Sequence, residues 1–162
     1  MPNLVIPPAR PKRILSPNEM NSHQRFGIDF DGTLVGHNAS WFLQQYIVTH
    51  PEKEFHLVTF RSHGRQWDIK EDLQESALNE THVRIFSHHF TEIHNMSDED
   101  FTKYNGAVRQ PEFYIWKAIK CKEIGCTILI DDMADFLYEH CEAHGVACFH
   151  PDDFMLGMPD GC

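Results

Sequence analysis

The segment from Arg25 to Val35, RFGIDFDGTLV, carries two aspartates, Asp29 and Asp31, that are separated by one residue. The apolar residues before them suit a short, fully buried strand, and the chain then turns sharply at Gly32. Because side chains alternate along a strand, we expect both carboxylates to point the same way. Two adjacent carboxylates repel each other and lose hydration on burial, so such a pair needs a bound cation or a shared proton. The segment therefore predicts a metal site that offers a nucleophile and an acid/base.

Polar side chains also follow two other apolar segments. FHLVTF, at residues 55–60, carries Thr59 near its end, and TILI, at residues 127–130, runs directly into Asp131 and Asp132. In a parallel sheet, ligands sit at the carboxyl ends of the strands. Any one of these segments alone could be a turn closed by a polar side chain. Their convergence predicts one site at one edge of a sheet.

The elements that must position these residues alternate between strands and helices. We expect strands at residues 25–30, 55–60, 83–86, 127–130 and 146–149, and helices at residues 39–49, 66–79, 111–123 and 136–144. This order predicts a three-layer α/β domain over residues 25–162, with a parallel sheet of about five strands and helices on both faces. The proline-rich residues 1–24 are expected to form a flexible arm. Residues 88–108 show no period and predict a functional loop or small insert, and the tail after Pro151 looks irregular.

Composition narrows the classes of partner. The 162 residues suffice for one domain with a sizeable core, and the net charge of −10 argues against a general affinity for nucleic acid or an anionic membrane. No apolar run is long enough to span a bilayer, and the first residues lack the apolar core of a signal peptide. A cytoplasmic location is the expectation.

Cysteine and histidine are both frequent in this chain. The five cysteines are odd in number and match no zinc spacing, which favours buried free thiols over a disulfide framework. Among the twelve histidines, His88, His89 and His94 could bind a metal. Exposed loop histidines are the favoured interpretation of these three.

The residue types suggest phosphoryl chemistry. Clustered carboxylates can hold Mg²⁺, which prefers a few protein carboxylates together with water and a phosphate oxygen. A carboxylate beside the ion can attack phosphorus, and a second one can protonate the leaving oxygen and then activate water. The Thr59 hydroxyl and the amides of the Gly32 turn can hold phosphate oxygens. A lysine is needed to balance the charge around the phosphoryl group.

Three segments resemble motifs of the haloacid dehalogenase-like hydrolase superfamily, and specifically of its phosphatases. Residues 29–33, DFDGT, resemble the first motif; residues 57–59, LVT, the second; and residues 128–132, ILIDD, the fourth. The resemblance covers roughly residues 25–150 and is specific as an ordered set, with the first motif as its most specific part. It implies a Rossmann-like three-layer fold and a Mg²⁺-dependent phosphomonoester hydrolase that forms an aspartyl-phosphate.

The resemblance also implies a role for each matching residue. Asp29 would be the nucleophile and a metal ligand, and Asp31 the general acid/base, with its backbone carbonyl on Mg²⁺. The substrate-binding residues would be Gly32, Thr33, Thr59 and Arg61, and the metal ligands Asp29, Asp31, Asp131 and Asp132. Asp131 with Asp135 fits one family spacing, whereas the LIDD run fits another in which Asp132 holds the ion.

The third motif, a lysine, departs from the family pattern, because Arg109-Gln110-Pro111 stands where a Lys-Pro pair is usual. Lys117 lies in the predicted helix before the fourth motif and is the favoured candidate. Lys120, Lys103 and Arg109 are its rivals, and an exposed helix lysine is the alternative interpretation of Lys117.

The short interval between Asp31 and Thr59 leaves no room for a large cap domain. Relatives with little cap tend to accept large phosphorylated substrates or to close the site with a partner subunit, so a homo-oligomer is one expectation. A binding or regulatory module without efficient turnover is the first alternative function. A nucleotide or polynucleotide-end phosphatase is the second, although the acidic charge speaks against it.

Overall fold

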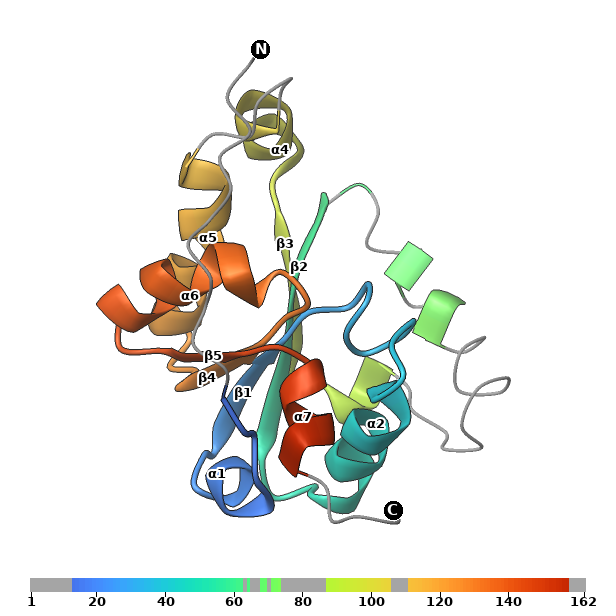
Figure 1. Ribbon diagram of the computed structural model, residues 1–162. Helices are drawn as coiled ribbons and strands as arrows, with labels where there is room; N and C mark the ends of the chain where they lie inside the picture. The colour runs from blue at the N-terminus through green and yellow to red at the C-terminus, as the bar shows by residue number, and fades with distance from the viewer. Residues whose placement is uncertain are drawn as a thin grey trace.

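The computed structural model describes residues 13–62, 64, 68–69, 71–73, 87–105 and 111–157. Its centre is an open parallel sheet of five strands in the order β3-β2-β1-β4-β5 (Figure 1). The strands are β1 (Arg25–Ile28), β2 (Glu54–Ser62), β3 (Glu92–Met96), β4 (Ile128–Ile130) and β5 (Ala147–Phe149). This confirms the predicted Rossmann-like α/β fold.

Helices cover both faces of this sheet, with α5 and α6 on one side and α1, α2 and α7 on the other (Figure 1). The helices are α1 (Pro17–Asn21), α2 (Ser40–Thr49), α4 (Asp98–Tyr104), α5 (Pro111–Glu123), α6 (Ala134–Ala143) and α7 (Asp152–Gly157), and Ser87–His89 forms a 3₁₀ turn. No helix among the described residues is both long enough and apolar enough to cross a membrane.

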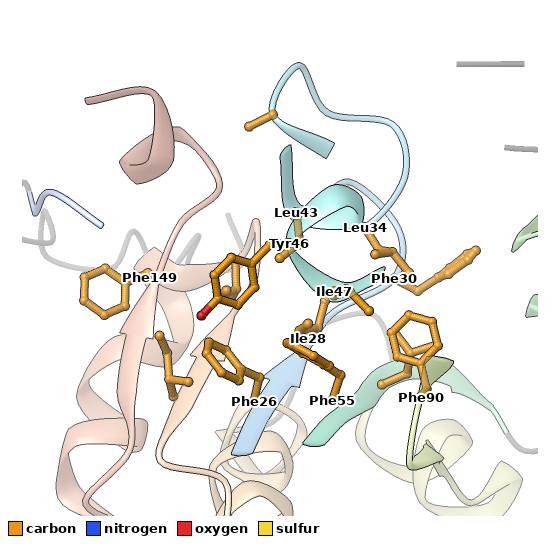
Figure 2. Packing of buried hydrophobic residues seen from close by; sticks show 14 of the residues in the cluster. Phe26, Ile28, Phe30, Leu34, Leu43, Tyr46, Ile47, Phe55, Phe90 and Phe149 are labelled. Carbon is orange, nitrogen blue, oxygen red and sulfur yellow. The ribbon is translucent and has the colours of Figure 1, made fainter. Parts of the chain in front are cut away.

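The face under α2 is built from aromatic and aliphatic side chains. Phe26 and Ile28 of β1 and Phe55 of β2 are almost completely buried beneath Leu43 and Ile47 of α2 (Figure 2). The rings of Phe26 and Phe55 lie 5.1 Å apart, in a tilted arrangement. Because these residues alternate with residues of the opposite face, β1 is fixed in register between two cores.

The opposite face allows α5 to approach β1 closely. A Cβ atom on Gly27 would lie 2.9 Å from Sγ of Cys121 and 3.3 Å from Cδ1 of Leu129. A glycine at this position therefore removes the side chain that would push the helix away. Cys121, Cys126, Cys141 and Cys148 are all free and buried, as the sequence predicts, and Cys162 lies outside the described residues.

The strand order creates a switch point beside β1. The chain proceeds outward from β1 to β2 and β3, and then returns to the other side of β1 to form β4 and β5. Crossovers therefore leave the carboxyl ends of β1 and β4 in opposite directions, which opens a crevice where ligands bind in open α/β sheets. Asp29 follows β1 and Asp131 follows β4, so both aspartates stand at this point.

Most predicted elements are confirmed to within two residues, among them the helix at Pro111–Glu123. The proline occupies the first turn, where its missing N–H costs nothing, and Gly125 has a positive φ of 78° just beyond the helix end. The predicted strand at residues 83–86 lies outside the described residues, as does most of the helix at residues 66–79.

Three boundaries differ from the predictions. The expected arm, residues 1–24, packs onto the domain from Leu15, and helix α1 buries Met20. The expected insert at residues 88–108 contains β3, an integral strand of the sheet, followed by α4. The tail after Pro151 forms α7, which buries Phe154 against Phe42 with ring centroids 5.3 Å apart. In each of these segments a few isolated apolar residues pack into the core. They show no periodic pattern in the sequence from which a helix or strand could be predicted.

Candidate active site

The register of the sheet brings Asp29 and Asp131 together. Gly27 pairs with Leu129 in the β1–β4 ladder, and the Asp29 amide donates a hydrogen bond to the carbonyl of Ile130 at 3.0 Å. Because Gly27 and Leu129 face α5, the residues two positions later extend toward the same helix. The two carboxylates therefore meet on the α5 side of the switch point.

Lys117 of α5 lies between these two carboxylates. Its Nζ is 2.9 Å from Oδ1 of Asp29 and 2.5 Å from Oδ2 of Asp131, and its side chain is completely buried. The same Nζ lies 4.2 Å from the centroid of the Phe60 ring, so the ammonium is held by an aromatic face as well as by charge.

The other candidates for the third motif are placed differently. Lys120 lies one turn further along α5 and pairs with Glu123 at 3.4 Å, whereas Lys103 stands over the ring of Tyr104. Arg109 lies outside the described residues. Among the described candidates, Lys117 is the one that reaches the paired aspartates.

A third carboxylate completes the acidic group. Asp29, Asp131 and Asp132 each offer an oxygen, and these oxygens all lie within 4.8 Å of one another. Asp132 is exposed, and its amide donates to Oγ1 of Thr33 at 2.9 Å, which ties the two acidic segments together. The group is therefore buried at Asp29 and Asp131 and open to solvent at Asp132.

Burial and mutual repulsion shift the protonation of the group. Burial raises the pKa of Asp29 well above its usual range, and the Asp131 carboxylate raises it further against the opposing effect of Lys117. Burial also raises the pKa of Asp131. For Lys117, burial alone would lower the pKa, but the Asp131 and Asp29 carboxylates outweigh it and raise the pKa. The single ammonium of Lys117 thus cannot neutralise the negative charge that the neighbouring carboxylates would carry if all were ionised.

This charge imbalance provides a test of whether a divalent cation fits. With all three carboxylates ionised, the single ammonium would leave two negative charges, which is the charge that one divalent cation balances. The donor atoms are all oxygens, the kind of ligand that Mg²⁺ prefers. The residues present therefore fit the metal that the sequence resemblance implies.

Asp31 does not join this acidic group, contrary to the expectation that it would point the same way as Asp29. Strand β1 ends at Ile28, and the chain has begun to turn when it reaches Asp31. Its half-exposed carboxylate is held by Arg61, which donates from Nε to Oδ2 at 2.8 Å and from Nη2 to Oδ1 at 2.7 Å. Two parallel charged hydrogen bonds fix the direction of the Asp31 side chain.

Arg61 is itself fixed by its surroundings. Its Nη2 also lies 2.9 Å from Oδ2 of Asp72, and its guanidinium stands 5.0 Å from the centroid of the Phe30 ring. Its Nη1 is buried and has no hydrogen-bond partner among the described residues. The hydrogen bond with Asp31, above all, raises the pKa of Arg61. Arg61 is therefore a permanently charged cation, and its Nη1 is a hydrogen-bond donor that no described residue uses.

The two threonines of the predicted phosphate site are buried. The Thr33 hydroxyl accepts from Asp132, as described above, and the Thr59 hydroxyl accepts from the amide of Arg61 at 3.1 Å. The two hydroxyls thus hold the loops that carry Asp132 and Arg61. Each hydroxyl still has its own proton, which it can donate to a further acceptor. Asn95 of β3 adds to this support, because its Nδ2 donates to the carbonyl of Arg61 at 3.0 Å.

Sequence reasoning missed two residues that contact the charged groups of the site: Phe60, which lies against Lys117, and Asp72, which pairs with Arg61. Phe60 immediately follows Thr59, and strand alternation places it on the α5 face, so its position under Lys117 could have been inferred. Asp72 lies in a segment with helical spacing whose exposed acidic residues are numerous, so nothing distinguished it in the sequence.

Gly32 sits directly under the Asp132 carboxylate. Its φ is 76°, and a Cβ atom there would lie 2.4 Å from Oδ2 of Asp132. Gly32→Ala is expected to destabilise the protein by about 1–2 kcal/mol through the left-handed backbone alone and, in addition, to weaken Mg²⁺ binding by moving Asp132. Chemical denaturation and calorimetric Mg²⁺ titration measure the two effects.

Gly145→Ala is the matched control for this substitution. Gly145 has a φ of 75°, but a Cβ atom there would meet nothing within 4 Å. It should therefore show the backbone cost without any loss of Mg²⁺ affinity. Equal Mg²⁺ affinity in the two alanine variants would contradict the expected role of Asp132 in binding Mg²⁺.

Comparisons with known proteins leave this site to be interpreted from its own geometry. No family model matches the chain, and no curated protein matches it. A solved structure of an uncharacterized protein from Corynebacterium glutamicum aligns with 78% of this chain and 83% of its own, at 12% identity and a TM-score of 0.46.

Proposed function

We propose that this protein is a Mg²⁺-dependent phosphomonoester hydrolase that forms an aspartyl-phosphate on Asp29. The observation that supports this proposal is the group at the switch point of the sheet: three clustered carboxylates and the buried ammonium of Lys117. Such a group is costly for stability, because buried charges lose hydration and the carboxylates repel one another. Perturbed titratable groups that cluster in this way are typical of catalytic sites.

Each residue of the chain has a definite task in this reaction. An Asp29 oxygen attacks phosphorus and forms an acyl phosphate, while the bond to the leaving oxygen breaks. Once released from Arg61, Asp31 takes up a proton from solvent and donates it to that leaving oxygen; it then takes a proton back from the water that hydrolyses the acyl phosphate. Lys117 holds the orientation of Asp29 through the 2.9 Å contact and offsets negative charge that develops on the phosphoryl oxygens.

The acidic group also indicates which aspartates would hold the cation. Both oxygens of Asp131 have partners: Oδ2 accepts from Lys117, and Oδ1 accepts from the Met133 amide at 2.8 Å. Asp132 is exposed, and no such pair of donors from the described residues holds its carboxylate, so it is the better direct ligand together with Asp29. Asp131 would support the site through Lys117 and the loop. When bound, Mg²⁺ supplies positive charge that stabilises the phosphoryl group in the transition state.

Arg61 links substrate binding to the release of Asp31. The Arg61 guanidinium is engaged by the Asp31 carboxylate, while its Nη1 has no hydrogen-bond partner within the part of the chain that the structure describes. A phosphate group is a bidentate acceptor that competes for the same donors. Binding of the phosphorylated substrate would thus free Asp31 for proton transfer.

The proposal is tested by hydrolysis of a generic aryl phosphate and by binding of beryllofluoride, which mimics the phosphoryl group on an aspartate. We expect hydrolysis with Mg²⁺, its loss after chelation, and its recovery when Mg²⁺ is returned. We also expect beryllofluoride to raise the melting temperature only when Mg²⁺ is present, because a ligand stabilises the state to which it binds.

The same two measurements separate the phosphatase from a module that has lost turnover. A broken site should neither hydrolyse the ester nor respond to beryllofluoride. If both responses are absent at saturating Mg²⁺, the phosphatase proposal fails, and the fold remains as a binding or regulatory module.

A further inference from the structure

A second polar group lies on the α5 face of the sheet, within the strands rather than at their carboxyl ends. His56 of β2 pairs directly with Glu92 of β3, and His94 pairs with Val58. Because residues two apart on a strand share a face, all three polar side chains project from the same side of the β2–β3 ladder. From its sequence, His94 is expected to be an exposed loop histidine, but it lies in strand β3 and is largely buried.

The distances within this group resemble those around a metal ion. Nδ1 of His56 lies 3.1 Å from Nε2 of His94, and this nitrogen lies 3.7 Å from Oε2 of Glu92. Two nitrogens bound at about 2.0–2.1 Å in a tetrahedral site lie about 3.3 Å apart, which is close to the observed separation. The hydrogen bond between the two imidazoles requires a proton on one of these two nitrogens, and a cation could take the place of that proton.

The far side of His56 supports the same interpretation. His56 is 5% exposed, and its Nε2 is buried without a hydrogen-bond partner among the described residues. Oε1 of Glu54 lies 3.7 Å from this nitrogen. Metal-bound histidines usually direct their second N–H toward a carboxylate that fixes the tautomer. If Nδ1 gives its lone pair to a cation, Nε2 carries the proton and faces Glu54.

The charges and the access route are also suitable. Burial lowers the pKa of both imidazoles, which favours the neutral form that binds metals. Two cations oppose the site, since the charge of Lys120 acts on His94 and that of Arg25 acts on His56, while Glu92 and Glu54 supply negative charge. The Glu92 side chain is 67% exposed, so it offers a route from solvent and leaves room for a water ligand.

A comparison with another histidine group shows what is distinctive here. His37, His150 and Asp152 also lie close together, but Nδ1 of His37 accepts from the Ala39 amide at 2.9 Å, and Nδ1 of His150 accepts from the Asp152 amide at 3.0 Å. Each neutral ring then carries its proton on Nε2 and has no lone pair left for a metal. The proximity of these three residues is therefore accounted for by the backbone hydrogen bonds of the turns in which they lie.

We propose that His56, His94 and Glu92 form a binding site for Zn²⁺ or a similar transition-metal ion, distinct from the oxygen-only site at Asp29. Imidazole nitrogens favour such ions over Mg²⁺, whereas the carboxylate group at the switch point favours Mg²⁺. A bound ion would join the edge strand β3 to β2, and would therefore stabilise the strand whose Asn95 supports the Arg61 loop.

Co²⁺ is the probe for this site, because tetrahedral nitrogen-containing sites give it a strong visible absorption. The metal-free protein is titrated with Co²⁺ in excess Mg²⁺, which occupies carboxylate sites and leaves imidazoles free. We expect saturable visible absorption that Zn²⁺ displaces, and a rise in melting temperature with Zn²⁺. His94→Gln and Glu92→Gln should each weaken Co²⁺ binding by at least about tenfold.

The controls keep the result interpretable. His150→Gln should bind Co²⁺ like the wild type, because it removes a histidine from the competing group. Glu92 is exposed, so Glu92→Gln should keep its melting temperature in the absence of metal, even if His94→Gln does not. Absence of Co²⁺ absorption in the wild type would overturn the proposal, and so would equal affinity in the wild type and Glu92→Gln. Neither result depends on phosphatase activity.

Discussion

Asp29→Asn is expected to lower kcat for aryl phosphate hydrolysis by at least about a thousandfold, the order of effect that follows removal of a covalent nucleophile. The asparagine amide has nearly the same shape but cannot form the acyl phosphate. The wild-type carboxylate is held by Lys117 at 2.9 Å, and an amide oxygen can accept the same hydrogen bond. Steady-state kinetics at saturating Mg²⁺ measure the change.

The same substitution should not destabilise the metal-free protein. Burial and the neighbouring Asp131 carboxylate raise the pKa of Asp29, which means that its ionised form is disfavoured where it stands. A neutral side chain of equal size relieves that repulsion, so we expect a free energy of unfolding that is unchanged or higher. Activity lost without stability lost is the pattern of a residue retained for catalysis.

Asp135→Asn is the matched control, and it also separates the two family spacings. Asp135 is exposed in the first turn of α6, and it does not belong to the acidic group found among the described residues. Its variant should keep wild-type activity within a few fold. If Asp135→Asn fell as far as Asp29→Asn, the assignment of Asp132 as the metal ligand would be wrong.

The carboxyl edge of the sheet was predictable because strands lead directly into its charged residues. Apolar runs end at Asp29 and Asp131, and parallel strands bring their carboxyl ends to one edge whatever the connecting helices do. The sequence therefore predicted that these carboxylates lie at one edge of the sheet, without any knowledge of strand order. It did not show that Asp29 and Asp131 lie on adjacent strands, which follows only from the return of the chain to β4 beside β1.

The orientation of Asp31 was not predictable, because alternation holds only while the backbone remains a strand. The chain turns after Asp29: the Leu34 amide donates to the Asp29 carbonyl at 3.3 Å, and the Gly32 amide to the Val35 carbonyl at 2.8 Å. The Asp31 carboxylate is thereby carried to Arg61. Strand β3 was missed for a different reason, because EIHNM has little apolar character and its histidine is buried by pairing with His56.

The face of α5 on which Lys117 lies decides whether this lysine can reach the carboxylates, and sequence reasoning left this face open. Phe113, Lys117, Ala118 and Cys121 are the buried residues of the helix. A lysine among apolar residues breaks the amphipathic pattern, and that break is itself a signal, since lysine is almost never fully buried without a partner. The partners in this case are carboxylates that lie far away in sequence.

Lys117→Met is expected to lower the free energy of unfolding by about 3–5 kcal/mol in the absence of metal, as happens when one partner of a buried ion pair is removed. The methionine fills a similar volume, so the loss reports charge rather than a cavity. Asp29 and Asp131 would be left buried at Oδ1 and Oδ2 without the ammonium that both now contact. Chemical denaturation with and without Mg²⁺ measures this loss and its recovery.

Lys120→Met provides the comparison, because it makes the same chemical change one turn along the same helix. Lys120 is partly exposed and pairs with Glu123 at 3.4 Å, so its loss should change stability by less than about 0.5 kcal/mol. Mg²⁺ should restore part of the stability of Lys117→Met, because a divalent cation supplies positive charge to the same carboxylates, but hydrolysis should remain impaired. A Lys117→Met protein as stable as Lys120→Met, with normal turnover, would show that the buried ammonium neither balances the acidic group nor serves the reaction.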